Sequence, residues 1–189
     1  MSSYTAIVLA ACIPAVATVV GFIVTYRLNK RNFEQEVIKA KRNIQLDKID
    51  DLPHEILSYI DLVNEGFSDD MEKEAFIEQL RSKGKPMQSK IIAYGSKDAI
   101  KLLMQAAELG REYYEAPDDA KDKKLIWKHD ACNVLLLCQA RYDLTGIETN
   151  PEFWYRIRRP YYIGKEDGFI ERNNKIVKDL NLNNFLLMK

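Results

Sequence analysis

The sequence predicts an all-α protein, in which one N-terminal transmembrane helix is followed by a cytoplasmic helical bundle. Three observations lead to this fold class. Apolar residues recur at the three-to-four-residue spacing of helices in most segments, the alternation typical of strands is scarce, and glycine is rare, with 8 in 189 residues. Beyond the predicted membrane helix about 160 residues remain, which is enough for one domain with a buried core.

The membrane helix is predicted from an uncharged run at residues 4–26, which contains no Asp, Glu, Lys or Arg. About 20 apolar residues in a helix span a bilayer core of roughly 30 Å. Residues 9–12 (LAAC) match a lipoprotein cleavage box, but no basic residue precedes Cys12 and the chain stays apolar after it. A retained anchor over residues 1–27 is therefore favoured over a cleaved or lipidated signal.

Three basic residues, Arg27, Lys30 and Arg31, follow the predicted span directly. Because Lys and Arg close to a span stay on the cytoplasmic side, we expect a single-pass protein of the inner (cytoplasmic) membrane. Its N-terminus would face out and the bulk of the chain would lie in the cytoplasm. The same three residues are predicted to contact the headgroups of the lipid bilayer, which attracts basic residues by about 1 kcal/mol each.

Within the span, one set of small or hydroxylated residues and a proline follows helical spacing. These residues are Ala11, Pro14, Thr18, Gly21 and Thr25. Small residues let membrane helices approach closely, so this face is predicted to self-associate. The alternative is that the segment is simply rich in small residues, as bacterial anchors are.

Helical periodicity continues past the span and predicts a basic juxtamembrane stalk over residues 28–52. Charge changes sign along this part of the chain, because residues 27–42 carry a net charge of +4 and residues 43–80 a net charge of −9. We expect the basic part to lie against the anionic membrane surface and the acidic part to stand away from it.

The cytoplasmic helical domain is predicted over residues 53–189. Pro53 after Asp51 suits the first turn of a helix, which we expect over residues 53–66. A short helix over residues 70–82 and a turn at residues 83–86 follow. The chain is then expected to be helical over residues 87–116, with a possible interruption at 94–96.

The strongest helix is predicted over residues 119–145. Near residues 134–138 it is apolar almost all round, which is typical of a helix buried between others, and Gly146 suits its C-cap. Asn150 followed by Pro151 begins a short helix that ends before Pro160, and a last helix is expected over residues 166–180.

Two short motifs resemble those of a known group. Residues 92–100 (IAYGSKDAI) resemble a Y-G-S-x-x-x-I element, and residues 140–146 (ARYDLTG) resemble an R-x-D-L-G element with Thr145 inserted before the glycine. In this order they resemble a loose group of uncharacterised bacterial single-pass membrane-anchored helical proteins, over roughly residues 90–160. The resemblance implies the same architecture and an association with mobile elements or phage defence, but no activity.

Common catalytic and metal-binding patterns are missing from the sequence. His54 and His129 are the two histidines, and neither has a recognisable nucleophile partner. His129 and Cys132, three residues apart, would need at least one further zinc ligand. Residues 94–97 lack the frame of a phosphate-binding loop, and the three cysteines form no C-x-x-C pair. We therefore expect no catalytic residue, no cofactor and no metal.

The segment 153–162 is the strongest candidate for binding, because it contains five aromatic residues and three arginines. In one interpretation, the core is filled by Phe153, Trp154 and Ile157, while the arginines face water or pair with the acidic stretch. It could instead bind a protein, a nucleotide or nucleic acid, or a membrane surface. The candidate partner-binding residues are Trp154, Arg156, Arg158, Arg159, Tyr161 and Tyr162.

Taken together, the patterns predict a non-enzymatic, membrane-tethered interaction or scaffold module. Basic and acidic residues are equal in number, 28 each, which gives no general signal for nucleic acid. We therefore expect a protein partner or a homo-oligomer. The alternative is a membrane-disrupting effector in phage defence, whose cytoplasmic domain gates clustering of the anchors. A third hypothesis is an enzyme with an unrecognised site, in which Arg141 and Asp143 would be the first pair to consider.

Overall fold

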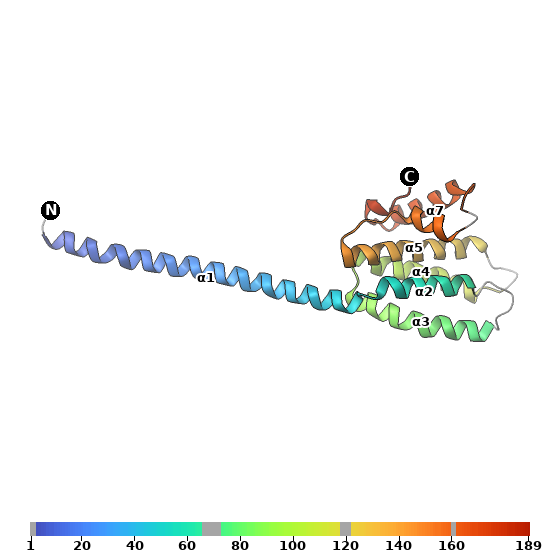
Figure 1. Ribbon diagram of the computed structural model, residues 1–189, viewed down its shortest axis with the longest axis horizontal. Helices are drawn as coiled ribbons and strands as arrows, with labels where there is room; N and C mark the ends of the chain where they lie inside the picture. The colour runs from blue at the N-terminus through green and yellow to red at the C-terminus, as the bar shows by residue number, and fades with distance from the viewer. Residues whose placement is uncertain (1–2, 66–72, 118–121, 160–161) are drawn as a thin grey trace. The chain divides into compact units, whose positions relative to one another are not determined.

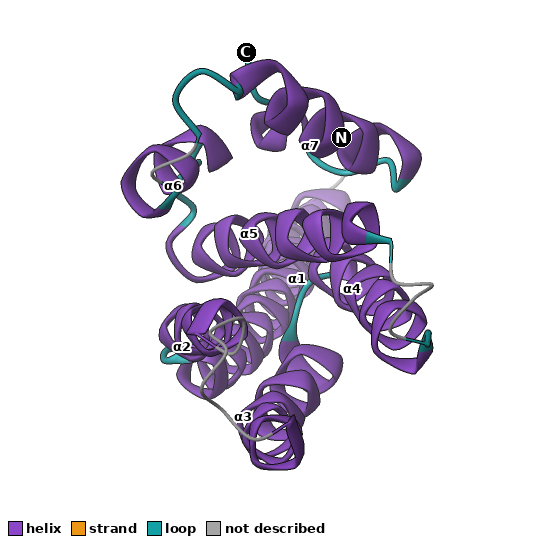
Figure 2. Ribbon diagram, turned by 90° about the vertical axis from the view of Figure 1, so that its right-hand side faces the viewer, coloured by secondary structure: helices purple, strands orange, loops and turns teal. Residues whose placement is uncertain are grey.

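The computed structural model describes residues 3–65, 73–117, 122–159 and 162–189, with side chains of the first helix described at Thr18 and from Val20 onward. The described residues form helices and loops without a strand, which confirms the all-α class and the helical bundle (Figures 1 and 2). The chain divides into two compact units, residues 1–45 and residues 46–189.

The first unit is formed by helix α1 (Ser3–Ile49), whose last residues belong to the second unit. The predicted localisation, a single-pass protein of the inner membrane with its bulk in the cytoplasm, is wrong. Among the described residues, no helix is both long enough and apolar enough to cross a bilayer.

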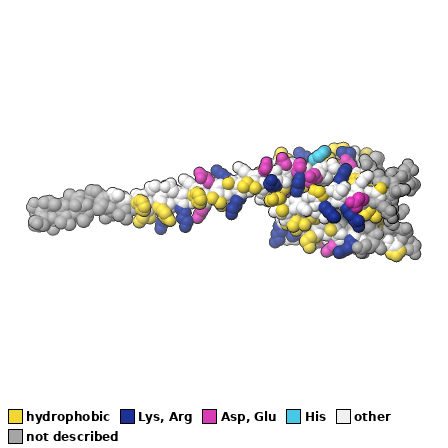
Figure 3. Space-filling model, turned by 90° about the horizontal axis from the view of Figure 1, so that it is seen from below, with side chains coloured by type: hydrophobic (Ala, Val, Ile, Leu, Met, Phe, Trp, Pro, Cys, Tyr) yellow, Lys and Arg dark blue, Asp and Glu magenta, His cyan; other side chains and the backbone are white. Residues whose placement is uncertain are grey.

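The physical reason for this correction is the composition of α1. From Arg27 onward, charged side chains alternate along the helix with hydrophobic ones (Figure 3), and each charge costs about 3 kcal/mol or more at the centre of a bilayer. The uncharged run at residues 4–26, on which the prediction of an anchor over residues 1–27 rested, has most of its side chains outside the described ones.

The residues predicted to self-associate or to contact lipid headgroups are exposed on α1 wherever their side chains are described. The side chains of Ala11 and Pro14 lie outside the described ones, and Thr18, Gly21 and Thr25 are exposed on α1. The residues assigned to lipid headgroups are also exposed on α1: Arg27, Lys30 and Arg31. Self-association of the first set and lipid contact of the second stay predictions.

The second unit is a helical bundle built around α5 (Lys123–Thr145). On one side α5 packs against α2 (Leu52–Glu65) and α4 (Lys97–Glu115), and α3 (Lys73–Tyr94) packs against both of these helices. On the other side lie α6 (Pro151–Arg158), α7 (Glu166–Asp179) and the 3-10 helix η2 (Asn184–Leu186) (Figure 2).

The central position of α5 follows from its composition. Cys132, Val134, Leu135 and Leu136 are fully buried, as expected for a helix that is apolar almost all round. Gly146 adopts the left-handed conformation after the last turn, with a φ of 71°, and donates its N–H to Tyr142 O at 2.7 Å. The predicted glycine C-cap is confirmed.

Helix α3 differs from the sequence-based expectation of a turn at residues 83–86, because it runs through Pro86 without a break. Its packing against α2 accounts for the continuity. A Cβ on the buried Gly84 would lie 3.3 Å from the Tyr59 ring, so glycine allows α3 to approach α2 closely. Met87 is buried directly after the proline, which faces solvent. Tertiary packing therefore outweighs the local preference for a turn.

The two short motifs meet in the fold, although they lie 47 residues apart. Ser96 is the N-cap of α4 and accepts a hydrogen bond from the Ala99 N–H. Its own backbone N–H donates to Asp143 at 3.3 Å, and the Gln139 amide donates to the same carboxylate at 2.8 Å. The motifs thus fasten the corner between α3 and α4 to the end of α5.

Candidate functional site

Helix α6 presents a different face to the core from the one we considered on sequence grounds, and of that expected face only Trp154 is partly buried against the core. Its buried residues, Pro151 and Tyr155, are four positions apart, and the next position in the series is the buried Arg159. Phe153 and Ile157 point to solvent, with 63% and 78% of their surfaces exposed. The start of the helix is fixed by Asn150, whose side-chain oxygen accepts a hydrogen bond from the Glu152 N–H at 2.9 Å.

Arg159 lies inside the protein because it has a counterion there. Its guanidinium donates to the carboxylate of Asp130 on α5, and both side chains are largely buried. Burial raises the pKa of Asp130, and the positive charges of Arg159 and Arg172 oppose that change. The ion pair ties the end of α6 to α5.

An aromatic cluster lies beside this ion pair. Tyr162 is fully buried and stacks on Tyr155 with a centroid distance of 5.8 Å, and Phe169 contacts both rings at 5.0 and 5.3 Å. Burial raises the pKa of the Tyr155 hydroxyl well above its usual value. Arg159 and Tyr162 therefore contribute to the folded interior, while Tyr161 lies outside the described residues.

Of the remaining described candidates, Arg156 and Arg158 are exposed, and Trp154 is partly buried against the core. Arg158 packs over the Trp154 ring at 5.4 Å and pairs with Asp61 at 3.5 Å, which is a contact with the acidic stretch of residues 43–80. Arg156 pairs within its own helix, with Glu152 at 2.7 Å. The five candidates that the structure describes are thus divided between core and surface and do not form one binding face.

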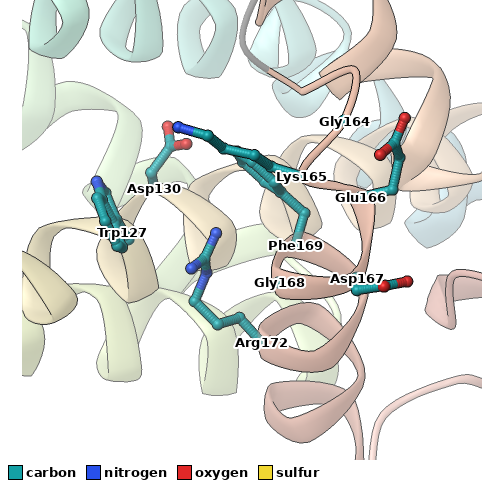
Figure 4. Close-up of a pocket in the computed structure, with 9 residues that line it drawn as sticks. All are labelled: Trp127, Asp130, Gly164, Lys165, Glu166, Asp167, Gly168, Phe169 and Arg172. Carbon is teal, nitrogen blue, oxygen red and sulfur yellow. The ribbon is translucent and has the colours of Figure 1, made fainter.

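A cleft between α5 and α7 lies next to the ion pair and has a volume of about 350 Å³. Helix α5 contributes Trp127 and Asp130, the turn before α7 contributes Gly164 and Lys165, and α7 contributes its first two turns (Figure 4). Gly164 has a φ of 86°, a conformation that favours glycine. We call this site the α5–α7 cleft.

Arg172 joins the two walls of the α5–α7 cleft. Its guanidinium lies 5.1 Å from the ring centroid of Trp127 and 4.8 Å from that of Phe169, so it packs against an aromatic ring from each helix (Figure 4). Cation–π contacts of this kind contribute about 0.5–2 kcal/mol. They hold the Trp127 side chain in place although 49% of its surface is exposed.

Trp127 and Arg172 are site residues that we did not predict from the sequence. They come from two helices and lie far apart in the chain, so no local motif connects them. The signal that was available is compositional: Trp127 is one of only two tryptophans, and it lies in the first turns of the helix that the sequence places at the centre of the bundle.

The nucleophilic and basic side chains in the core of α5 are buried and unreactive. Burial lowers the pKa of His129 to about 4, and raises the pKa of the Cys132 and Cys138 thiols to about 12. His129 contacts the Asn133 amide at 3.3 Å. Among the residues that the structure describes, no three His, Cys, Asp or Glu side chains are grouped closely enough to hold a metal ion.

A second cleft of about 510 Å³ lies among α2, α3, α4 and α5. Three exposed basic residues border it: Arg81, Lys85 and Arg111. Its aromatic residue, Tyr59, is largely covered, and burial raises the pKa of its hydroxyl. The second cleft therefore offers charge at its border but not a half-exposed aromatic anchor like Trp127.

Comparison with known proteins gave no matching family, no similar curated protein and no similar solved structure. The resemblance of the two short motifs to membrane-anchored helical proteins stays a prediction.

Proposed function

We propose that this protein is a non-enzymatic interaction module whose helical bundle binds a peptide segment of a partner protein in the α5–α7 cleft. The observation that carries the proposal is the half-exposed Trp127, held by Arg172 at the mouth of an open cleft. Tryptophan and arginine are the residues most enriched among those that dominate binding energy at protein interfaces.

The cleft supports a peptide as the ligand because of its size and charge. A volume of about 350 Å³ is at the lower end of the range for ligand sites and suits one or two side chains. Its border carries both signs of charge, with Lys165 and Arg172 beside Glu166 and Asp167. A mixed border of this kind favours a mixed polar segment over a polyanion, and an apolar side chain of the segment would pack on Trp127.

The unreactive groups in the core support a non-enzymatic role. His129 is neutral at pH 7 and its ring is buried, so it is poorly suited to general acid–base catalysis. Thiols with a pKa of about 12 are protonated at neutral pH and are weak nucleophiles. Asp143 accepts hydrogen bonds that fasten α4 to α5, and Arg141 beside it is exposed.

The proposal is tested by selecting peptides from a displayed library of random 12-residue sequences on the immobilised full chain. Selected peptides should share an apolar or aromatic anchor residue. Their affinity, measured by fluorescence anisotropy, should fall by about 30-fold or more for Trp127→Ala, the loss typical of a dominant interface residue. Met104→Ala is the matched control, because Met104 is a large exposed apolar residue on α4, outside this cleft.

Circular dichroism and the melting temperature establish that Trp127→Ala leaves the bundle folded, which we expect because the side chain is half-exposed. Selection of no peptide above background would contradict the proposal. Peptides that bind Trp127→Ala as tightly as the unmodified chain, or that depend on Arg111 in the second cleft, would also contradict it.

A further inference from the structure

The described part of α1 carries an apolar stripe with the seven-residue repeat of a coiled coil. Within residues 23–44, the intervals between successive stripe positions alternate between three and four residues. The seven positions are Ile23, Tyr26, Lys30, Phe33, Val37, Ala40 and Ile44. Six of the seven are apolar, and Lys30 is the exception. This spacing keeps one seam facing a partner helix along its whole length.

The stripe has no partner within the described residues of the chain. Tyr26, Phe33 and Ile44 are 62%, 66% and 60% exposed, and Val37 is partly exposed. Helical stability in proteins comes mainly from packing of an apolar face, and large exposed apolar surfaces mark interaction sites. A helix of 47 residues with this stripe on its surface therefore needs a second element to cover it.

The residues that flank the stripe identify a second copy of the chain as that element. In a parallel coiled coil, the residues that border the stripe on one helix face bordering residues of the other helix, five positions further along the chain. Glu36 of one copy would thus face Lys41 of the other, and this pair would occur twice by symmetry. The complementary charges fit a parallel, in-register arrangement.

The stripe residues also fit two helices better than three or four. Ile23, Val37 and Ile44 are β-branched and occupy one set of alternate stripe positions, as in two-stranded coiled coils, while Tyr26, Phe33 and Ala40 occupy the other set, where leucine is usual. Lys30 occupies the same set as Ile23, and a single polar residue there fixes register and oligomeric state. Within residues 23–44, three other exposed large apolar residues lie off the stripe: Val24, Leu28 and Ile38.

We propose that residues 23–44 of α1 pair with the same segment of a second copy as a parallel, in-register, two-stranded coiled coil. This inference is independent of the α5–α7 cleft, because it concerns the first unit alone. Its consequence is a dimer that carries two bundles, and binding of a partner with two matching segments would gain from the linkage.

The first test compares substitutions at two neighbouring apolar residues. Val37→Asp puts a charge into the seam, and Ile38→Asp puts the same charge one residue away, off the stripe. By light scattering after size-exclusion chromatography, the full chain and Ile38→Asp should be dimers. Val37→Asp should raise the dimer dissociation constant by about 100-fold or more, because a buried unpaired charge is costly. Both positions precede Leu46, where the bundle unit begins, so its fold is unaffected.

The second test addresses orientation. Glu36→Lys and Lys41→Glu should each raise the dissociation constant by about 2- to 5-fold for each pair disrupted, and the double variant should restore the original value. Ala40→Cys in a Cys12→Ser background should form an intermolecular disulfide on oxidation, because residue 40 would face its own copy across the seam. The native Cys132 and Cys138 are buried and should not compete.

Several results would overturn the proposal. The unmodified chain could remain a monomer at about 100 μM, a concentration at which most chains would be paired if the dimer had micromolar affinity. Val37→Asp and Ile38→Asp could reduce association equally, which would assign it to unspecific apolar contact. A trimer or larger assembly, or failure of residue 40 to cross-link within an intact dimer, would exclude the parallel two-stranded arrangement.

Discussion

At the scale of single residues, the polar groups buried in and around α5 are held in specific pairs. Asp130 receives Arg159 from the end of α6, His129 contacts Asn133, and Gln139 donates to Asp143. Buried polar groups are costly unless they are hydrogen-bonded, so these pairs restrict the arrangements open to an otherwise apolar helix. The first two of these pairs each lead to a prediction about stability.

Removing one partner of the Asp130–Arg159 ion pair should destabilise the protein strongly. Arg159→Met leaves Asp130 buried without its counterion, which should lower the free energy of unfolding by about 3–5 kcal/mol in urea titrations. Asp130→Leu combined with Arg159→Met should recover most of that loss, because neither charge is then left alone. Arg156→Met, which removes an exposed pair with Glu152, is the control and should change little. A double variant as unstable as the single one would contradict this account.

His129 should make stability depend on pH. Burial lowers its pKa from 6.5 to about 4 in the folded protein, so the unfolded chain binds a proton that the folded protein excludes between these values. The contribution of His129 is therefore complete above pH 6.5 and is lost as the pH falls towards 4, by at most about 3 kcal/mol. As the pH is lowered from 7 to 4, the unfolding free energy of the unmodified chain should fall by more than that of His129→Gln. A constant difference would show that His129 titrates normally.

At the scale of elements, the sequence predicts helices best where caps and breaks are local. The interruption at residues 94–96 and the cap at Gly146 are both present, because Ser96 and Gly146 act within one turn of the chain. The turn expected at residues 83–86 is absent, since packing of α3 on α2 outweighs the local effect of Pro86.

Two glycines give a matched test of how the elements join. A Cβ on Gly95, between α3 and α4, would lie 2.6 Å from the Ile91 carbonyl oxygen. Gly95→Ala should therefore lower the free energy of unfolding by about 1–3 kcal/mol. A Cβ on Gly168, inside α7, would meet only Arg172 at 3.9 Å, so Gly168→Ala should raise the stability by about 0.5–1 kcal/mol. Thermal unfolding of both variants checks the signs, and equal effects would contradict the proposed close approach at Gly95.

At the scale of the whole molecule, sequence patterns identified the helical class but not the surfaces. The predicted localisation in a membrane is wrong, because no described helix is long and apolar enough to cross a bilayer. The orientation of α6 could not be derived, because it depends on the ion pair of Arg159 with Asp130, which lies far away in the sequence. The α5–α7 cleft could not be predicted for the same reason. It exists only once two distant helices bring Trp127 and Arg172 together.

The proposed role of the whole molecule combines a bundle that binds a peptide with a helix that pairs two copies. In a dimer, two clefts would engage a partner with two matching segments more tightly than one cleft alone, provided that both can be reached at once. The binding claim and the pairing claim stand on different residues, so failure of one leaves the other to be judged on its own test.

The most direct test of the binding claim is the fluorescence of Trp127. Trp127 and Trp154 are the only tryptophans, so Trp154→Phe leaves a single reporter in the cleft. Titration with a selected peptide should shift the emission of the half-exposed Trp127 to shorter wavelengths, saturably and with one peptide per chain, because the bound side chain would remove water from the indole. Emission that stays constant while anisotropy reports full binding of the peptide would contradict the claim that Trp127 forms the binding site.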